Sequence, residues 1–178
     1  MCTECRKYYP EFRVSINLSY VQILKSPLMM ELKQMIEHSG ISCSGIIVEL
    51  TESGYLEGTP AVRSVWNDMK QLRIQIALDD FGTGYSNLMN ISNLEPDIVK
   101  LDRGFTLKAL SRSYEYQLMQ YVIEMVHKLN QYVCVEGVET KEDLEKIKAL
   151  GPDLIQGYYY SKPCSRDEFL KKFFGYSE

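Results

Sequence analysis

One stretch of the sequence decides the fold class: residues 74–86, which read IQIALDDFGTGYS. A nearly continuous apolar run ends there in two aspartates, and a loop with two glycines follows. Apolar runs of this kind are typical of strands that are buried on both faces, as in parallel sheets. The two aspartates therefore lie at the carboxyl end of a predicted strand, where α/β proteins place their functional side chains.

Short apolar runs alternate along the chain with longer segments that have helical periodicity. This alternation predicts parallel βα units with six strands, at residues 12–18, 46–51, 74–79, 98–101, 132–136 and 154–160. A complete (βα)8 barrel takes about 250 residues, whereas this chain has 178. We therefore expect an α/β fold: an incomplete (βα)8 TIM-like barrel of about six units that lacks the first two. An open, doubly wound sheet is the alternative architecture.

Capping residues predict where several helices begin. Ser19 with Gln22 and Ser165 with Glu168 have the spacing of capping boxes. Further helices are expected to begin at Pro60, Ser113 and Thr140. Gly40 and the pair Gly151-Pro152 are placed to end the helices that begin near Ser19 and at Thr140.

The composition is that of an acidic globular domain. Lys and Arg number 20 and Asp and Glu number 24, so the formal net charge is −4. Binders of nucleic-acid polymers usually carry a basic excess, so this class is disfavoured. The sequence predicts no membrane segment, and five cysteines, an odd number, fit reduced thiols in the cytoplasm. Cys2 and Cys5 form a CxxC pair, for which a zinc site and a frayed terminus are the two interpretations.

Polar side chains lie at the carboxyl end of every predicted strand. In chain order they are Asn17, Glu49, Thr51, Glu52, Asp79, Asp80, Lys100, Asp102, Glu136, Glu139 and Gln156. Any one of them has an ordinary explanation as a helix cap, a turn residue or half of a surface ion pair. Packing alone does not explain why all six strands place such groups at one mouth, so the joint pattern predicts a functional site.

Carboxylates predominate in this set, and converging carboxylates repel one another unless a positive charge lies among them. Carboxylate and amide oxygens select the hard ions Mg²⁺ or Mn²⁺ over zinc. The residues by themselves therefore predict a Mg²⁺ or Mn²⁺ site with a lysine nearby. Two chemistries suit such a site: phosphoester hydrolysis by a metal-activated water, and enolate stabilisation with the lysine as base.

Six short segments carry a family resemblance. They are VSINLS at 14–19, ELTES at 49–53, DDFGTGYS at 79–86, DIVKLD at 97–102, VEGVET at 135–140 and QGY at 156–158. In this order and spacing they resemble the EAL-domain family of cyclic-di-GMP phosphodiesterases, bacterial signalling enzymes with a (βα)8-type barrel. The resemblance covers about residues 12–174. We therefore expect residues 1–178 to form one partial EAL domain.

The resemblance implies a set of metal ligands at the mouth. Asn17, Glu49, Asp79 and Glu136 would be ligands of the divalent metals, and Asp80 would be a ligand of the second ion. The implied cofactors are thus Mg²⁺ or Mn²⁺ at a two-metal site. Two such ions stabilise the attacking and the leaving oxygen of an in-line displacement.

The resemblance also implies roles for the other polar residues of the mouth. Lys100 would orient or activate the attacking water, and Glu52 would anchor the loop that starts at Phe81. Glu139 and Gln156 would support the network of metal-bound water. The implied reaction is the hydrolysis of one phosphodiester bond of cyclic di-GMP, which yields linear pGpG.

The chain departs from the family in one respect. It contains no Glu-Ala-Leu segment, after which the family is named, and the nearest string is Lys148-Ala149-Leu150 at a predicted helix end. One metal ligand and part of the nucleotide-binding wall would therefore be missing, and the unpaired sheet edge should favour a homodimer or other self-association. A catalytically inactive cyclic-di-GMP-binding or protein-interaction module is the alternative function, and an unrelated barrel enzyme with a lysine base is a third. Upstream sensor or GGDEF-type domains are expected in a parent protein.

Overall fold

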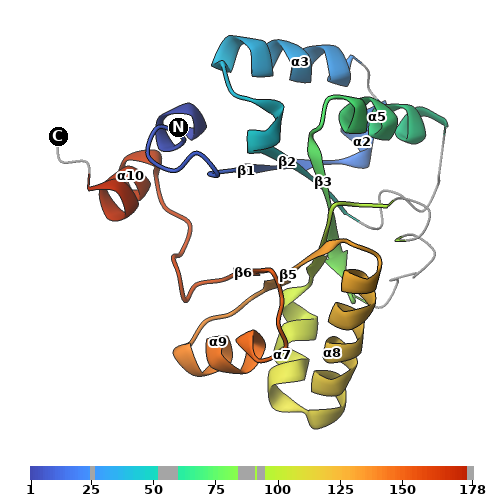
Figure 1. Cartoon of the computed structure of the whole chain (residues 1–178), viewed down its shortest axis with the longest axis vertical. Helices are drawn as coiled ribbons and strands as arrows, with labels where there is room; N and C mark the ends of the chain where they lie inside the picture. The colour runs from blue at the N-terminus through green and yellow to red at the C-terminus, as the bar shows by residue number, and fades with distance from the viewer. Residues whose placement is uncertain (25–26, 52–59, 84–90, 92–94, 176–178) are drawn as a thin grey trace.

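Figure 1 shows a computed structural model of the chain, which describes residues 1–24, 27–51, 60–83, 91 and 95–175. Six parallel strands form one sheet in the order β1-β2-β3-β4-β5-β6. They are β1 (Val14–Leu18), β2 (Ile46–Thr51), β3 (Gln75–Phe81), β4 (Ile98–Leu101), β5 (Tyr132–Glu136) and β6 (Leu154–Gln156). The sheet curls into a half-barrel, and β1 and β6 are its edges among the described strands. The predicted incomplete barrel is confirmed.

Helices connect the strands and flank the sheet in two groups. They are α1 (Cys2–Cys5), α2 (Tyr20–Leu24), α3 (Leu28–Ser39), the 3₁₀ helix η1 (Cys43–Gly45), α5 (Pro60–Gln71), α7 (Arg103–Ser111), α8 (Ser113–Lys128), α9 (Lys141–Lys148) and α10 (Arg166–Phe174). The helices α2 and α3 contact α5, whereas α8 and α9 contact α7 (Figure 1). No helix in the described ranges has the length and apolar character that crossing a membrane requires.

Capping boxes set the starts of two helices: the predicted one at Ser165, and one at Thr140, where the sequence predicts only a helix start. The hydroxyl of Thr140 accepts a hydrogen bond from the Asp143 N–H, and the Asp143 carboxylate accepts one from the Thr140 N–H. Ser165 and Glu168 form the same pair of bonds at the start of α10. Each box supplies acceptors for two N–H groups that the helix itself leaves unpaired. The capping residues therefore determine where these two helices begin.

Several of the sequence predictions differ from the structure. The segment from Ser19 to Gly40 holds two helices rather than one, and Pro27 is the N-cap of the second because proline breaks an interior turn. The helix α7 is not predicted by the sequence patterns. The last strand ends at Gln156 instead of residue 160, because the chain turns there: the Tyr160 N–H donates to the Gly157 carbonyl at 3.1 Å.

The strand register divides the side chains into an outer and an inner face, because successive residues of a strand point to opposite sides. On the outer face, buried residues such as Val48, Leu78 and Val99 pack with helix residues in the main core. On the inner face, a separate small apolar cluster consists of Ile47, Ala77, Ile98 and Cys134. Glu49 and Lys100 follow this cluster two positions further along their strands, so the polar groups lie above an apolar floor.

A β-bulge near the end of β3 extends that strand beyond its predicted end at Asp79. Leu78 pairs with Val99 and Phe81 pairs with Leu101, so β3 uses three steps where β4 uses two. The extra residue is Asp80, whose φ of 61° lies in the left-handed region. Because of this bulge, Phe81 joins Leu78 in the outer core, and Asp80 is kept out of it. Two adjacent aspartates are therefore compatible with a buried strand.

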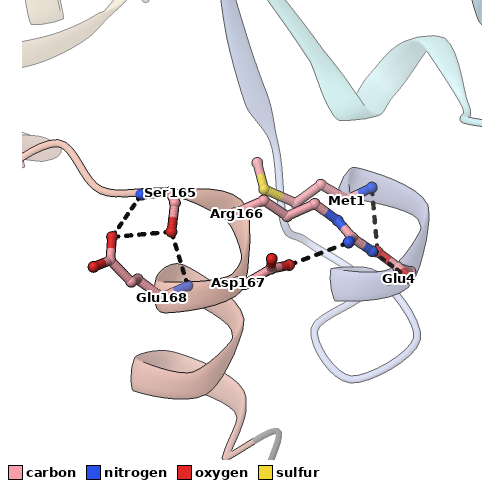
Figure 2. A network of polar contacts seen from close by, with 6 residues as sticks. All are labelled: Met1, Glu4, Ser165, Arg166, Asp167 and Glu168. Carbon is pink, nitrogen blue, oxygen red and sulfur yellow. Dashed lines mark hydrogen bonds and ion pairs between the residues drawn. The ribbon is translucent and has the colours of Figure 1, made fainter. Parts of the chain in front are cut away.

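The helix α10 lies at the open side of the half-barrel, beside the N-terminal segment (Figure 1). Nη2 of Arg166 donates to both carboxylate oxygens of Glu4, at 2.9 and 2.8 Å (Figure 2). Edge-on ring contacts join the same two segments: Phe12 lies 6.0 Å from Phe169, and Tyr9 lies 5.5 Å from Phe174 between ring centroids. These contacts hold α10 against the segment that leads into β1.

The cysteines do not form the zinc site that was one interpretation of the CxxC pair. All five lie in described parts of the chain and are free thiols. Cys2 Sγ donates to the Gly45 carbonyl at 3.8 Å, and Cys5 is fully buried. Burial raises the pKa of both thiols, so they are neutral hydrogen-bonding and packing groups at neutral pH.

Candidate active site

The carboxyl ends of the parallel strands bring four predicted site residues together on the inner face. The ammonium nitrogen of Lys100 lies 2.7 Å from Glu49 Oε2, 3.0 Å from Asp79 Oδ1 and 2.6 Å from Glu136 Oε1. These residues come from β4, β2, β3 and β5, so four adjacent strands contribute to a single cluster. Lys100 is only 4% exposed. The predicted convergence of carboxylates around a positive charge is present, and the charge is that of the lysine.

The ionisation of this cluster follows from its burial and its hydrogen bonds. Burial by itself lowers the pKa of Lys100, but the hydrogen bonds to Glu136, Glu49 and Asp79 outweigh it, and the pKa is raised. Lys100 is therefore a permanent cation at neutral pH. Burial raises the pKa of Glu136, and the bond from Lys100 offsets part of this effect. In this arrangement the ammonium group of Lys100 donates hydrogen bonds to all three carboxylates.

A cavity of about 550 Å³ lies below the cluster, inside the curve of the sheet. Its walls include the apolar floor residues Ile47 and Ala77, and Phe169 and Phe173 of α10 close part of its open side. Cys134 also faces it, and burial raises the pKa of this thiol to about 12. Glu49 and Lys100 also line this cavity, so the ion cluster meets it beside the apolar floor.

Asp80 lies beside the cluster, on the bulge of β3. Burial raises its pKa first, and repulsion from the neighbouring Asp79 and from Asp102 raises it further. Asp102 is the N-cap of α7 and accepts a 2.7 Å hydrogen bond from the Gly104 N–H. The two aspartates thus extend the acidic surface from the buried cluster toward the solvent.

A second cavity, of about 420 Å³, adjoins the cluster on the side of β5 and β6. It is lined by Glu136, Glu139 and Gln156, three residues that the sequence analysis places at the mouth. Arg103 at the start of α7 also lines it and donates a 2.7 Å hydrogen bond to Glu139 Oε1. Arg103 is not among the site residues predicted from the sequence, although its position directly after the strand-end residue Asp102 is a usable signal.

Asn17 and Glu52 differ from the other predicted site residues. Asn17 pairs with Glu49 across β1 and β2 and so shares the inner face, but it lies exposed on the edge strand. Glu52 lies outside the described residues. Within the described ranges, no group of three or more His, Cys, Asp or Glu residues is arranged to hold a metal ion. The carboxylates of the cluster bind the lysine instead.

Comparison with known proteins identifies the family. The model of the EAL domain family matches residues 1–163. This chain belongs to the EAL-domain family. PdeF of Escherichia coli K12, named a cyclic di-GMP phosphodiesterase, is 32% identical over 160 residues, which are 90% of this chain and 21% of PdeF.

Solved structures show the same EAL fold. The EAL enzyme Bd1971, bound to cAMP and cyclic di-GMP, is 29% identical with a TM-score of 0.88, over 96% of this chain and 45% of that one. BlrP1 of Klebsiella pneumoniae, in a complex with calcium and cyclic di-GMP, is 25% identical with a TM-score of 0.81, over 89% of this chain and 41% of that one. This chain thus spans about a fifth of the length of PdeF and less than half of the length of Bd1971 and of BlrP1.

The donor set of this EAL domain suits a divalent cation by its chemistry. Glu49, Asp79, Asp80 and Glu136 offer carboxylate oxygens from β2, β3 and β5, and hard divalent ions prefer such ligands. Lys100 holds three of these carboxylates at distances of 2.6 to 3.0 Å. A divalent ion can bind them only if the lysine releases at least one. A divalent ion at this cluster would therefore compete with the lysine for the same oxygens.

Proposed function

We propose that this EAL domain hydrolyses one phosphodiester bond of cyclic di-GMP to give linear pGpG, with Mg²⁺ or Mn²⁺ as cofactor. The observation that carries the proposal is the cluster of Glu49, Asp79 and Glu136 around Lys100 at the mouth of an EAL-family sheet. Relatives named as cyclic di-GMP phosphodiesterases, and the relative solved with calcium and cyclic di-GMP, support the substrate and the use of a divalent ion.

The position of Lys100 favours hydrolysis over enolate chemistry with a lysine base, because its ammonium group donates to three carboxylates. Its ammonium group has three donors, and each faces a carboxylate. If a metal took over one of these carboxylates, the freed donor could orient an attacking water while the remaining partners fix the position of Lys100. Glu139 and Gln156 line the adjoining cavity and can hold further water molecules beside Glu136.

Glu49, Asp79, Asp80 and Glu136 are the residues that we propose hold the metal, with Asn17 as a further oxygen ligand from the edge strand. When bound, divalent ions activate a water molecule and stabilise the charge of the leaving oxygen. Glu52 remains the residue proposed to anchor the loop after Phe81. We place the chain in the cytoplasm, where the five free cysteines stay reduced, and we expect the open edges of β1 and β6 to favour a homodimer.

The second candidate function is a binding module without catalysis. The hydrogen bonds from Lys100 to three carboxylates favour it, because they satisfy the acidic cluster without a metal. The absence, among the described residues, of a group arranged to hold a metal ion points the same way. Such a module keeps the cavities beside the cluster and binds cyclic di-GMP without cleaving it.

One experiment separates the two candidates. The purified chain is incubated with cyclic di-GMP and Mn²⁺, and pGpG is followed by chromatography. The hydrolase predicts pGpG formation that is lost in Asp79→Asn and retained in Asp167→Asn, which changes an exposed aspartate on α10. Binding of intact cyclic di-GMP without pGpG supports the module. If the chain neither binds nor cleaves the dinucleotide, both proposals are wrong.

A further inference from the structure

Arg103 is the first residue of α7, and its side chain lies at the carboxyl ends of β4 and β5. The backbone of Asp102 is tied to the end of β3, because its N–H donates to the Phe81 carbonyl at 3.0 Å. The start of α7 is thereby fixed relative to the strands that carry the ion cluster. Arg103 thus has a defined position at the mouth.

The stem of Arg103 packs directly on the backbone of Gly137, the residue after β5. Gly137 has a φ of 80°, and a Cβ added to it would lie 2.9 Å from Arg103 Cβ and 3.1 Å from Arg103 Cα. Only glycine therefore leaves room for this stem. At its far end, the guanidinium donates through Nη2 to Glu139 Oε1. Contacts at both ends of the side chain direct Arg103 along the cavity wall.

The guanidinium keeps free donors for a ligand. Glu139 is its ion-pair partner among the described residues and engages one nitrogen of the planar fork. The Arg103 side chain is 58% exposed, whereas that of Lys100 is 5% exposed and its ammonium already bonds three carboxylates. An arginine fork can give two parallel hydrogen bonds to a phosphate group.

The mouth carries mostly negative charge, so a phosphate ligand needs a positively charged side chain there. The described residues around it include Glu49, Asp79, Asp80, Glu136 and Glu139. A dinucleotide with two phosphates is repelled by this surface unless a cation faces it. Arg103 lines the 420 Å³ cavity together with Glu136, so a phosphate bound to it lies next to the ion cluster.

We propose that Arg103 is a ligand-binding residue of this EAL domain, which donates hydrogen bonds to a phosphate group of the bound cyclic dinucleotide in the cavity between β5 and β6. The inference rests on the proposed substrate. Glu139 orients the guanidinium, and Tyr158 on the same wall offers an aromatic face for the adjoining base. Arg103 thereby adds to the mouth an exposed cation that does not depend on a metal.

The test compares three variants of the full chain. Affinity for cyclic di-GMP is measured by calorimetry with Ca²⁺ present, and chromatography checks that the ligand stays intact. Losing a charge-assisted pair of hydrogen bonds in Arg103→Ala should raise Kd about tenfold, and Arg103→Lys should recover part of the loss. Arg112→Ala is the matched control, because Arg112 lies at the other end of α7 and forms a similar ion pair with Glu115. Its Kd should stay within about twofold of wild type.

An NMR signal of the Arg103 side chain distinguishes ligand binding by Arg103 from a structural role of this residue. The Nε–H resonance of Arg103, assigned by its loss in Arg103→Lys, should shift when cyclic di-GMP is added. If the wild type binds but Arg103→Ala binds equally well, the inference is wrong and the proposed function stands. If the wild type does not bind the dinucleotide, the proposed function is wrong, and dimethyl phosphate decides the inference. A shift of the Arg103 signal with this phosphodiester supports an anion site, and no shift overturns it.

Discussion

Glu49 Oε2 accepts a 2.7 Å hydrogen bond from Lys100 Nζ, although the two residues are 51 positions apart in the sequence. Glu49 is 8% exposed and Lys100 4%, so the pair is buried at the end of the inner face. A buried pair of this kind contributes little to stability in total, yet removing one partner is costly because the other charge remains without compensation.

The first prediction concerns the cost of removing Lys100 from its carboxylate partners. Lys100→Met leaves the carboxylates of Glu49, Asp79 and Glu136 without their common partner, so we expect a loss of about 3–5 kcal/mol in the free energy of unfolding. Urea unfolding measures it. Lys146→Met, which removes a solvent-exposed pair with Glu142, is the control and should leave the unfolding midpoint unchanged.

Metal addition extends the same prediction. If lysine and metal compete for the carboxylates, Mn²⁺ should raise the melting temperature of Lys100→Met more than that of the wild type. An equal shift in the two proteins would show that the ion binds elsewhere. No shift in either would argue against a divalent site in the isolated chain.

The second prediction concerns the bulge in β3. Asp80 has a φ of 61°, which aspartate and asparagine tolerate far better than β-branched residues. We expect Asp80→Asn to keep the stability of the wild type and Asp80→Val to lose about 1–3 kcal/mol. Urea unfolding at neutral pH distinguishes them. Equal stability of the two variants would mean that position 80 does not need the left-handed conformation.

The third prediction concerns two aspartates at the opposite end of the sheet. Asp97 Oδ2 accepts a 2.8 Å bond from the Ile76 N–H, and Asp153 Oδ2 accepts a 2.8 Å bond from the Val133 N–H. Alanine at either position leaves a backbone donor without its acceptor, which should cost about 1–3 kcal/mol. The asparagine variants keep an acceptor oxygen and should lose less. Thermal unfolding of the four variants measures this difference, and similar losses for alanine and asparagine would contradict it.

The fourth prediction concerns the pH dependence of the contact between α10 and the N-terminal segment. Hydrogen bonds from Arg166 lower the pKa of Glu4 from its ordinary value of 4.5. A carboxylate whose pKa is lowered by folding stabilises the folded state above its ordinary pKa, and the effect is lost as the pH falls through the lowered value. The wild type should therefore exceed Glu4→Gln in urea midpoint at pH 7. The difference should begin to shrink near pH 4.5 and disappear once the pH falls below the lowered pKa of Glu4. A difference that persists in acid would exclude this ion pair as its cause.

Much of this fold can be read from local patterns. The apolar runs locate all six strands, because a strand buried on both faces needs apolar residues whatever its neighbours are. Thr140 and Ser165 locate two helix starts, because capping acts within four residues. The repeated Pro-Asp pairs at 96–97 and 152–153 precede two strands, but their hydrogen bonds to the neighbouring strands have no local signature.

The sequence by itself determined the family and which polar residues lie at the mouth, since strand ends in a parallel sheet share one edge. Only the tertiary structure decided how these residues meet: that Lys100 joins three carboxylates, that the bulge at Asp80 separates two adjacent aspartates, and that Arg103 faces Glu139. Periodicity and capping act over a few residues, so the sequence can show them. Distances between side chains from different strands depend on register, bulges and burial, which arise only when the whole sheet packs.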